Sequence, residues 1–438
     1  MSINLLFLVP YVPTPIRVRS YNLIRALAHQ GHRVTLATLW ESEEERAFLP
    51  QLEAEGIRVI AQRLTRNRRL SNALAALPTR LPLQARYCWQ PDLAAAVAAE
   101  LDTGRYQVLH VEHLRGAIYA QHLQAHLRAR NASIPVVWDS VDCISYLFAQ
   151  AAQQSRSRKG RLMTRLELPR TRRHEAELVQ QFDAVLVTSR KDREAFADLL
   201  GQSDLLVHDS PTNPVRNLNK TLHVLPNGVD TDFFAPLTAY CKPNSIVVSG
   251  KMSYHANVTM VMHLVQDIMP RVWQQCPEAQ LWVVGKDPPS SISRLDPSWS
   301  PNRAAPLMGD SGERIVVTGT VPDLRPYLQQ AAVAVAPVPY GAGVQNKVLE
   351  AMACGRAVVA SPQAVAALDV TPGEHLLVAD DAESFADDVL ELLANPEQRD
   401  LMGRSARKYV QEKFSWTASA LMLEQIYELA HQHAKTLS

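Results

Sequence analysis

The sequence predicts an α/β protein built from two Rossmann-like βα domains that face each other across a cleft. Short apolar runs alternate with helical patterns along most of the chain, and this alternation restarts after a Pro-Asn-Gly turn at 226–228. A chain of 438 residues with 47% hydrophobic side chains is also long enough to bury two cores. We expect an N-terminal domain at 1–237, a C-terminal domain at 238–415 and a terminal helix at 416–438 that packs back on the first domain.

The first half contains the strands of one parallel sheet. Its first apolar run, at 5–9, ends in a proline-rich loop, and a helical pattern at 20–30 stops at Gly31. Strand, helix and strand in this order form a βαβ unit, which implies parallel pairing. Further strands are expected at 33–38, 57–60, 108–111, 135–138, 184–188 and 222–225, with helices at 92–101 and 191–200.

The second half repeats the pattern after the turn. Residues 288–312 are rich in Pro, Ser and Gly and are expected to form a long loop. Strands are expected at 245–249, 280–284, 315–318, 333–338, 357–360 and 376–378, and helices at 257–275, 345–354, 382–393, 396–413 and 416–435.

The stretch 333–362 reads as strand, glycine turn, helix, glycine and strand. Such a unit directs the amides of a glycine loop and a helix N-terminus at one point, which suits an anionic ligand such as a phosphate. Lys347 and Glu350 are three residues apart and share a helix face, so they could bind phosphate and sugar hydroxyls. The alternative is a solvated ion pair on a crossover helix.

Composition limits the compartment and the cofactors. The five cysteines are odd in number, widely spread and without a CxxC pair, which indicates a reducing cytoplasm and no structural metal. The N-terminal apolar run is too short for a signal peptide, and no stretch approaches the roughly 18 apolar residues of a membrane span. We expect a cytoplasmic protein whose contact with a membrane, where it has one, is peripheral.

The charge is unevenly distributed. Residues 1–235 carry a net charge of +6 and residues 236–438 carry −5. Eight basic side chains against the single Glu167 lie in the run 156–173. A solvated helix face is the commonest explanation; contact with anionic lipid headgroups or a lipid-phosphate acceptor comes second. Nucleic acid is disfavoured because no aromatic side chains interleave with the charges.

Several function classes lack their motifs. The chain has no GxGxxG after an early strand, no GxxxxGK[ST] and no GxSxG. Nicotinamide-dependent oxidoreductases, P-loop phosphotransferases and α/β-hydrolases are therefore disfavoured.

A series of motifs follows in a fixed order along the chain. They are PNGVD at 226–230, SGKM at 249–252, VVGKD at 283–287, VTGTVPD at 317–323, GAGVQNKVLEAMACGRAVVAS at 341–361 and KFSW at 413–416. Together with the N-terminal PYVPTPIRVRSYNLIRALAHQGHRVTL at 10–36, this series resembles the family 4 retaining glycosyltransferases of the GT-B fold, the group 1 glycosyltransferases. The resemblance implies a C-terminal domain that binds a nucleotide-diphosphate sugar, an N-terminal domain that carries the acceptor, and no cofactor or metal beyond the donor.

In the second half the resemblance assigns ribose binding to Glu350, which matches the second glutamate of the family's E-x7-E motif. The first glutamate falls at Ala342, so the sugar ring is expected to be held by backbone amides instead. These are the amides of Gly341, Ala342, Gly343 and Val344.

The diphosphate ligands also depart from the family pattern. Lys251 matches the first of two basic residues, but the second falls at Asn257, and we expect Lys347 to supply the missing charge. Gly250 and Val321 complete the expected nucleotide-sugar site.

In the first half, the family's Gly-Gly loop is replaced by PTPIR at 13–17. Arg17 or Arg19 is expected to contact phosphate in its place; the alternative is a surface or helix-start role.

The family's active-site histidine aligns with Glu112, and His113 is the next residue. Both follow a strand end, which is where a site residue is expected. Asp139 and Asp142 follow the next strand and are further candidates, with capping of the following helix as their alternative role.

The resemblance implies a front-face displacement assisted by the leaving diphosphate. Lys251, Lys347 and a helix N-terminus would neutralise the charge that builds on the β-phosphate. We expect a metal-independent, hexosyl-type retaining glycosyltransferase of polysaccharide or glycolipid biosynthesis. The alternatives are a sugar-nucleotide 2-epimerase of the same fold and a catalytically silent nucleotide-binding module, the latter suggested by Ala342 and Asn257.

Overall fold

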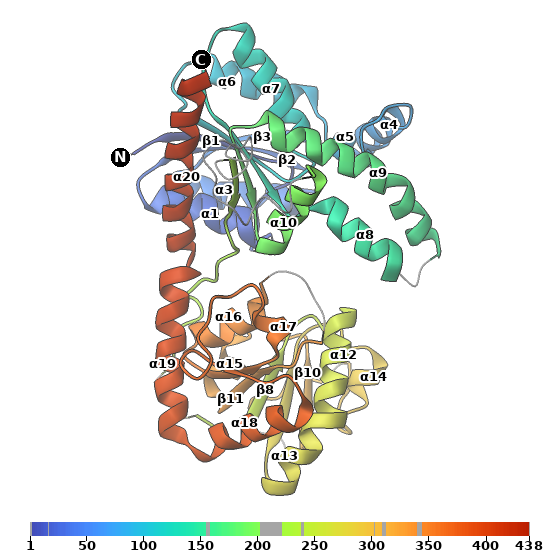
Figure 1. Ribbon diagram of the computed structural model, residues 1–438, viewed down its shortest axis with the longest axis vertical. Helices are drawn as coiled ribbons and strands as arrows, with labels where there is room; N and C mark the ends of the chain where they lie inside the picture. The colour runs from blue at the N-terminus through green and yellow to red at the C-terminus, as the bar shows by residue number, and fades with distance from the viewer. Residues whose placement is uncertain are drawn as a thin grey trace. The chain divides into compact units, whose positions relative to one another are not determined.

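A computed structural model shows two compact α/β units (Figure 1). The structure describes residues 2–15, 17–154, 158–201, 221–237, 241–301, 303–308, 312–339 and 344–437, with only the backbone of 150–154, 158–164 and 433–437. The first unit comprises residues 1–227 and 419–438, and the second comprises residues 228–418. The division between the units lies before the expected position at 238, and it also passes through the terminal helix.

The first unit contains a parallel sheet of seven strands within the described residues, in the order β3-β2-β1-β4-β5-β6-β7. The prediction of a parallel sheet is confirmed, since each pairing is parallel. The strands are β1 (Asn4–Val9), β2 (Arg33–Trp40), β3 (Arg58–Arg63), β4 (Val108–Glu112), β5 (Val136–Val141), β6 (Ala184–Val187) and β7 (Leu222–Val224).

Helices connect these strands and cover the sheet (Figure 1). In the first of them, Leu23, Ile24 and Leu27 are fully buried at helical spacing, which fixes the face that packs on the sheet. The helices are α1 (Val18–His29), α2 (Glu43–Arg46), α3 (Leu49–Ala54), α4 (Arg66–Ala76), α5 (Leu83–Tyr87), α6 (Pro91–Leu101), α7 (Ala117–Ala129), α8 (Ile144–Gln154), α9 (Arg158–Gln181) and α10 (Arg190–Leu199).

The terminal helix α20 (Trp416–Leu437) belongs to the first unit from residue 419 onward. Tyr427 is buried, and its hydroxyl shares a hydrogen bond of 2.8 Å with Nδ1 of His110 on β4. Glu424 pairs with His32, which lies just before β2. The last segment of the chain therefore completes the core of the first unit.

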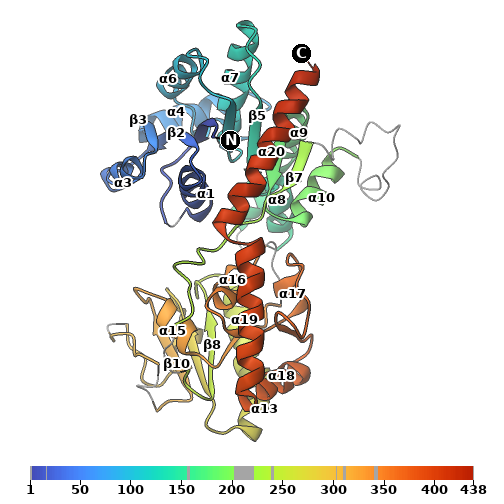
Figure 2. The same ribbon diagram turned by 90° about the vertical axis from the view of Figure 1, so that its left-hand side faces the viewer.

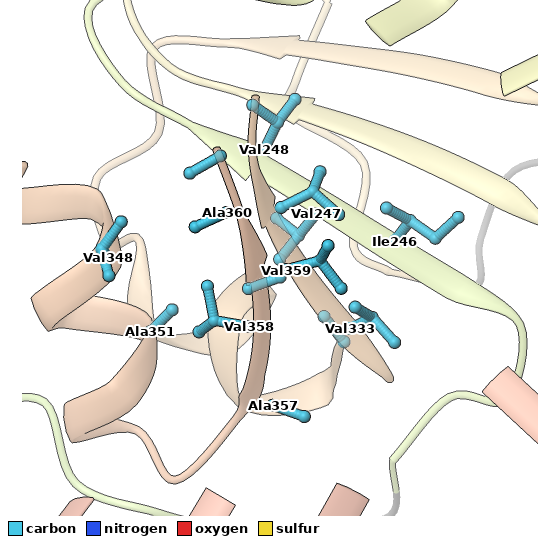
Figure 3. Close-up of a cluster of buried hydrophobic side chains, with 14 of the residues drawn as sticks. Ile246, Val247, Val248, Val333, Val348, Ala351, Ala357, Val358, Val359 and Ala360 are labelled. Carbon is cyan, nitrogen blue, oxygen red and sulfur yellow. The ribbon is translucent and has the colours of Figure 1, made fainter. Parts of the chain in front are cut away.

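The second unit contains six parallel strands in its described residues, in the order β10-β9-β8-β11-β12-β13. Buried valine, isoleucine and alanine side chains of the central strands pack against Val348 and Ala351 of a crossover helix (Figure 3). The strands are β8 (Ser245–Ser249), β9 (Gln280–Val284), β10 (Ile315–Gly319), β11 (Val333–Ala336), β12 (Ala357–Ala360) and β13 (Leu377–Val378).

The helices of the second unit flank this sheet, with α18 and α19 along one side (Figure 2). The helix expected at 257–275 contains a π-helical segment, η2, just before Pro270, whose missing amide cannot continue the α-helical ladder. The elements are α12 (His255–His263), η2 (Leu264–Ile268), α13 (Met269–Gln275), α14 (Ser290–Ser293), α15 (Arg325–Gln330), α16 (Asn346–Ala353), α17 (Pro362–Val365), α18 (Ala382–Ala394) and α19 (Pro396–Lys413).

The long loop expected at 288–312 contains the short helix α14 in its first part. Ile292 of α14 is fully buried, and the carboxylate of Asp296 accepts a hydrogen bond of 3.0 Å from the amide of Val317 at β10. The Pro- and Ser-rich composition does not reveal this anchoring, because it depends on a contact with a strand farther along the chain.

Candidate functional site

In parallel α/β sheets, ligands bind beyond the carboxyl ends of the strands. At this end of the second unit, the loops after β8 and β9 meet through two glycines. Gly250 has φ of 149° and Gly285 has φ of 156°, and a Cβ atom on Gly285 would lie 1.7 Å from the carbonyl oxygen of Gly250. Only glycine fits this approach, which leaves the backbone at the end of β8 open to a neighbouring side chain.

That neighbouring side chain is Asn257 in the first turn of α12. Its Nδ2 donates to the carbonyl of Lys251 at 2.9 Å, and its Oδ1 accepts from Nζ of Lys347 at 3.0 Å. A Cβ atom on Gly250 would lie 2.8 Å from Nδ2 of Asn257. Asn257 therefore joins the end of β8 to the start of α16, and it holds the Lys347 ammonium between them.

The electrostatics of Lys347 and Glu350 follow from burial. Burial lowers the pKa of Lys347, although the charge of Glu350 acts in the opposite direction. Burial also raises the pKa of Glu350 to about 7, against the charge of Lys347. Lys347 donates to Asn257 and Gln345, at 3.0 Å and 3.3 Å, so the alternative of a simple solvated pair with Glu350 is not what the structure contains. An ammonium group that donates to neutral amide oxygens can exchange these hydrogen bonds for stronger ones to an anionic ligand.

Three other residues expected at this site are described. Lys251 is exposed directly after Gly250, Val321 follows β10, and Val344 precedes α16, the two valines being partly buried against the core. Gly341, Ala342 and Gly343 lie outside the described residues, so their expected sugar contacts stay a prediction.

In the first unit, Arg19 of α1 lies buried at the strand ends. Its Nε donates to Oδ2 of Asp139 at 2.8 Å, and one terminal nitrogen donates to the carbonyl of Leu225 at 2.9 Å and to Oδ1 of Asn227 at 3.0 Å. The second terminal nitrogen has no hydrogen-bond partner among the described residues. Arg19 thus joins the ends of β5 and β7 and retains one unused donor.

Glu112, the last residue of β4, is also buried. Tyr11 donates to one of its carboxylate oxygens, while Oε2 has no hydrogen-bond partner within the described part of the chain. Burial raises the pKa of Glu112 to about 7, and the nearby charge of Asp139 adds to this effect. Near neutral pH this carboxyl can therefore hold or release a proton.

Asp139 differs from Glu112 although both are buried. Burial favours its neutral form, but the Arg19 guanidinium and His110 outweigh this and lower the pKa of Asp139. Burial also lowers the pKa of His110, whose Nε2 lies 3.7 Å from Oδ2 of Asp139. Two adjacent carboxyls with opposite pKa shifts are typical of sites that handle protons.

His113 lies just beyond Glu112 with φ of 68°, and its amide donates to the carbonyl of Asp139 at 2.6 Å. Burial lowers the pKa of His113 to about 4, and the charge of Arg115 lowers it further, so the imidazole is neutral. Val141, the last residue of β5, has φ of 69°, which is strained for a β-branched residue, and its amide donates to Oδ1 of Asp139 at 3.1 Å. Strained backbone at two adjacent strand ends is a frequent feature of functional sites.

The helix-capping interpretation of Asp139 and Asp142 is wrong. The first amides of α8, those of Ile144 and Ser145, donate to the carboxylate of Glu175 on α9 at 2.8 Å and 3.0 Å. Oδ1 of Asp142 accepts instead from the hydroxyl of Thr188 at 3.3 Å. A distant glutamate supplies the cap, which leaves Asp139 available for Arg19.

Arg17 lies nearer the surface than Arg19. Its guanidinium pairs with Glu45 at 2.9 Å, donates to the carbonyl of Val12 and covers the ring of Tyr11 at 4.7 Å.

Sequence analysis missed Tyr11, His110, Asn227 and Tyr427. For Asn227 the Pro-Asn-Gly turn was a usable signal, whereas the contacts of His110 and Tyr427 join segments far apart in sequence.

The described residues contain no group of three or more His, Cys, Asp or Glu side chains arranged to hold a metal ion. Within them, no helix has both the length and the apolar character needed to cross a membrane.

The chain matches two family models: residues 16–207 match a glycosyl transferase 4-like domain, and residues 243–395 match glycosyl transferases group 1. It is 32% identical over 90 residues to an uncharacterized glycosyltransferase of Methanocaldococcus jannaschii, an alignment that covers 20% of this chain and 23% of the relative. It is 29% identical over 213 residues to a GDP-mannose-dependent monoacylated α-(1-6)-phosphatidylinositol monomannoside mannosyltransferase of Corynebacterium glutamicum, covering 45% of this chain and 53% of the relative. The matched part of the chain thus spans about half or less of the length of these curated relatives.

The solved structure of Anabaena HepE in complex with UDP and glucose has the same fold. Its TM-score to this chain is 0.57 at 15% sequence identity, with 97% of this chain and 99% of HepE covered. The two parallel sheets and this likeness show the GT-B fold. The chain belongs to the family 4, group 1 glycosyltransferases.

Proposed function

We propose that this glycosyltransferase is a retaining, hexosyl-type enzyme that moves a sugar from a nucleotide-diphosphate donor to a glycan or lipid-linked acceptor in polysaccharide or glycolipid biosynthesis. The observation that carries the proposal is the Lys347 ammonium, held by Asn257 at the end of β8, with Glu350 one turn farther along the same helix. In this arrangement Lys347 and the exposed Lys251 bind the diphosphate, and Glu350 accepts hydrogen bonds from the ribose hydroxyls.

The relatives support a nucleotide-activated hexose as donor. The C. glutamicum relative is GDP-mannose-dependent by name, and HepE was solved with UDP and glucose. Because these two differ in base and sugar, both UDP- and GDP-hexoses belong in the test.

The proposed step needs charge neutralisation on the leaving group. The bond between C1 of the sugar and the β-phosphate oxygen breaks, and its electron pair stays on that oxygen. The acceptor hydroxyl forms the new bond to C1 from the same face, and its proton passes to the departing phosphate. Lys251, Lys347 and the N-terminus of α16 stabilise the negative charge, so the step requires no metal ion.

On the first unit, the proposal assigns the acceptor to the strand ends around Glu112. Its unpartnered Oε2 can accept a hydrogen bond from an acceptor hydroxyl, and the unused donor of Arg19 can bind an anionic group. His113, being neutral, can orient the acceptor without adding charge.

We also propose that the protein works in the cytoplasm in peripheral contact with an anionic membrane through the run 156–173. Of this run, residues 165–173 have described side chains, and Arg165, Arg172 and Arg173 are exposed. On α4 and at its C-cap, the side chains of Leu70, Leu74 and Leu77 are 64%, 65% and 51% exposed. Arg170 ties the two segments together by donating to the carbonyl of Leu77 at 3.2 Å. Basic and apolar side chains on neighbouring helices are typical of interfacial membrane contact.

A donor panel tests the enzymatic proposal. The purified protein is incubated with UDP- and GDP-hexoses and a membrane lipid extract, with and without EDTA, and nucleotide release is followed together with the anomeric configuration of the product. Donor-dependent release with retained configuration, unchanged by EDTA, is the expected result. Thermal stabilisation by UDP or GDP without release from any donor would favour the silent module, and a C2-epimerised sugar would favour the epimerase.

A further inference from the structure

The first unit contains a cavity of about 730 Å³ between α8, α9 and α10. This volume lies within the range of small-molecule binding sites. Figure 1 shows α8 and α9 running side by side, with α10 beside them. The lining residues are Cys143, Ser145, Tyr146 and Ala149, then Arg165, Leu168, Pro169, Arg172, Arg173 and Ala176, then Ala195, Asp198 and Leu199.

Buried hydrogen bonds link the three helices around Cys143, one of the residues that line this cavity. Glu175 on α9 accepts from the amides of Ile144 and Ser145 at the start of α8. Asp192 on α10 accepts from the amide of Cys143 at 3.0 Å. The three helices therefore converge at Cys143, and the cavity lies where they separate.

The opposite side of α9 is anchored as well. Glu167 is buried and accepts from the amide of Leu83 at 2.8 Å, while Arg170 donates to the carbonyl of Leu77. Pro169 removes one amide from the helix ladder at this level. These contacts hold the basic face of α9 in place without occupying Arg165 or Arg172.

The charges in the cavity are asymmetric. The lining residues include three arginines of α9 and one acidic residue, Asp198, and Arg173 already pairs with Glu177 on its own helix at 3.2 Å. The remaining lining is largely apolar, with Leu168, Leu199 and three alanines. Arginines beside an apolar cavity suit an amphiphilic ligand. The arginines bind its anionic head, and its apolar chain is removed from water by the apolar walls.

We propose that this cavity binds one anionic lipid, with the phosphate of its head on Arg165 and Arg172 and part of its acyl or prenyl chain against Leu168 and Leu199. The proposal rests on the membrane contact proposed above and deepens it, since it replaces diffuse adsorption by a saturable site. A free phosphate would use the arginines alone and leave the apolar walls in water. The apolar lining therefore favours a lipid over an inorganic anion.

Short-chain lipids in monomeric solution test the site without a membrane. Isothermal titration calorimetry on the full-length protein uses dihexanoyl-phosphatidylglycerol, dihexanoyl-phosphatidylcholine and inorganic phosphate, each below any aggregation threshold. We expect one phosphatidylglycerol molecule to bind per protein chain. Phosphatidylcholine lacks the net negative charge and inorganic phosphate lacks the acyl chains, so both are expected to bind more weakly by on the order of ten-fold or more.

Two variants locate the binding. Ala195→Trp fills the cavity and Arg172→Glu reverses a charge at its wall, so each is expected to weaken phosphatidylglycerol binding by on the order of ten-fold. Ala129→Trp and Arg128→Glu, which change exposed positions on α7, are the matched controls and should bind as the parent protein does. Arg172 is exposed, so its variant is expected to fold even where the tryptophan is not tolerated.

Three results would overturn the proposal. They are the absence of phosphatidylglycerol binding, equal binding of inorganic phosphate, and binding that survives both Ala195→Trp and Arg172→Glu. Flotation with vesicles containing phosphatidylglycerol separates this failure from that of the membrane contact. Vesicle binding retained by a protein that binds no monomeric lipid would leave the peripheral contact standing and remove the site.

Discussion

Nζ of Lys347 lies 3.0 Å from Oδ1 of Asn257, a residue 90 positions earlier in the chain. Asn257 occupies the position where the family resemblance places a second basic diphosphate ligand. In this chain an amide at that position holds a lysine from another helix. A positive charge therefore lies beside Asn257, and its role as a diphosphate ligand stays a prediction.

Replacing Lys347 with methionine is expected to weaken the binding of UDP or GDP. The change removes a half-buried cation while keeping its aliphatic stem, and a charge-assisted hydrogen bond contributes about 1.5–3 kcal/mol, or roughly ten-fold to over one-hundred-fold in affinity. Isothermal titration calorimetry with both nucleotides measures the loss. Lys408→Met, at an exposed position on α19, is the control, and equal affinities of the two variants would exclude Lys347 as a diphosphate ligand.

Replacing Glu350 with alanine is expected to weaken nucleotide binding by about 1–3 kcal/mol, since a charged acceptor is removed from the ribose hydroxyls. The same change should matter less for a 2′-deoxynucleoside diphosphate, which lacks one of these hydroxyls. Comparing parent and variant with both ligands isolates the ribose contact. Equal losses for the two ligands, or a loss matched by the exposed Glu412→Ala, would contradict the assignment.

These residues also show how far sequence reasoning reaches. The strands follow from apolar runs bounded by glycine and proline, and the shared face of Lys347 and Glu350 follows from helical spacing, because both signals are local. The contact of Arg19 with Asp139 joins residues 120 positions apart, and the pairing of β5 with β6 shifts in register between Asp139 and Val141. Sequence analysis named both residues as candidates without pairing them, since a single sequence does not encode such a register in a readable pattern.

The pH dependence of stability is expected to reveal the buried carboxyl of Glu112. Its pKa rises from an ordinary 4.5 to about 7 in the folded protein, so the folded state binds more protons than the unfolded state between these values. The free energy of unfolding therefore falls as pH rises through this window, and the contribution is present below pH 4.5 and lost above pH 7. Glu112→Gln, which cannot titrate, should flatten this decline by about 1–3 kcal/mol.

Urea unfolding of the parent protein and the Glu112→Gln variant at pH 5, 6, 7 and 8 measures this difference. Other titrating groups, including His113, whose lowered pKa acts in the opposite direction, are present in both proteins and largely cancel. Glu53→Gln at an exposed position of α3 serves as the control and should keep the parent's slope. Parallel curves for the parent protein and Glu112→Gln would show that Glu112 is ionised throughout.

The close approach of Gly285 to Gly250 gives a prediction about the second unit. Alanine at position 285 would place its Cβ 1.7 Å from a backbone oxygen at a φ of 156°, so the loops after β8 and β9 must separate. We expect Gly285→Ala to destabilise the second unit by about 4 kcal/mol. Single substitutions cause a loss of stability of this size only through a few mechanisms, which include strain and clashes of this kind. Gly373→Ala is the control, since Gly373 also has a positive φ, of 85°, but open space around it.

The same variant should lose nucleotide binding beyond its loss of stability, because separated loops no longer hold Asn257 and Lys347 beside Gly250. Titration at a temperature where Gly285→Ala remains folded by circular dichroism separates the two effects. The control at 373 should lose about 1 kcal/mol of stability from its backbone conformation and keep the parent's affinity for UDP and GDP. If Gly285→Ala behaved like this control in both measurements, the ends of β8 and β9 could not approach as closely as the structure places them. The close approach of these loops would then not be what positions Lys347.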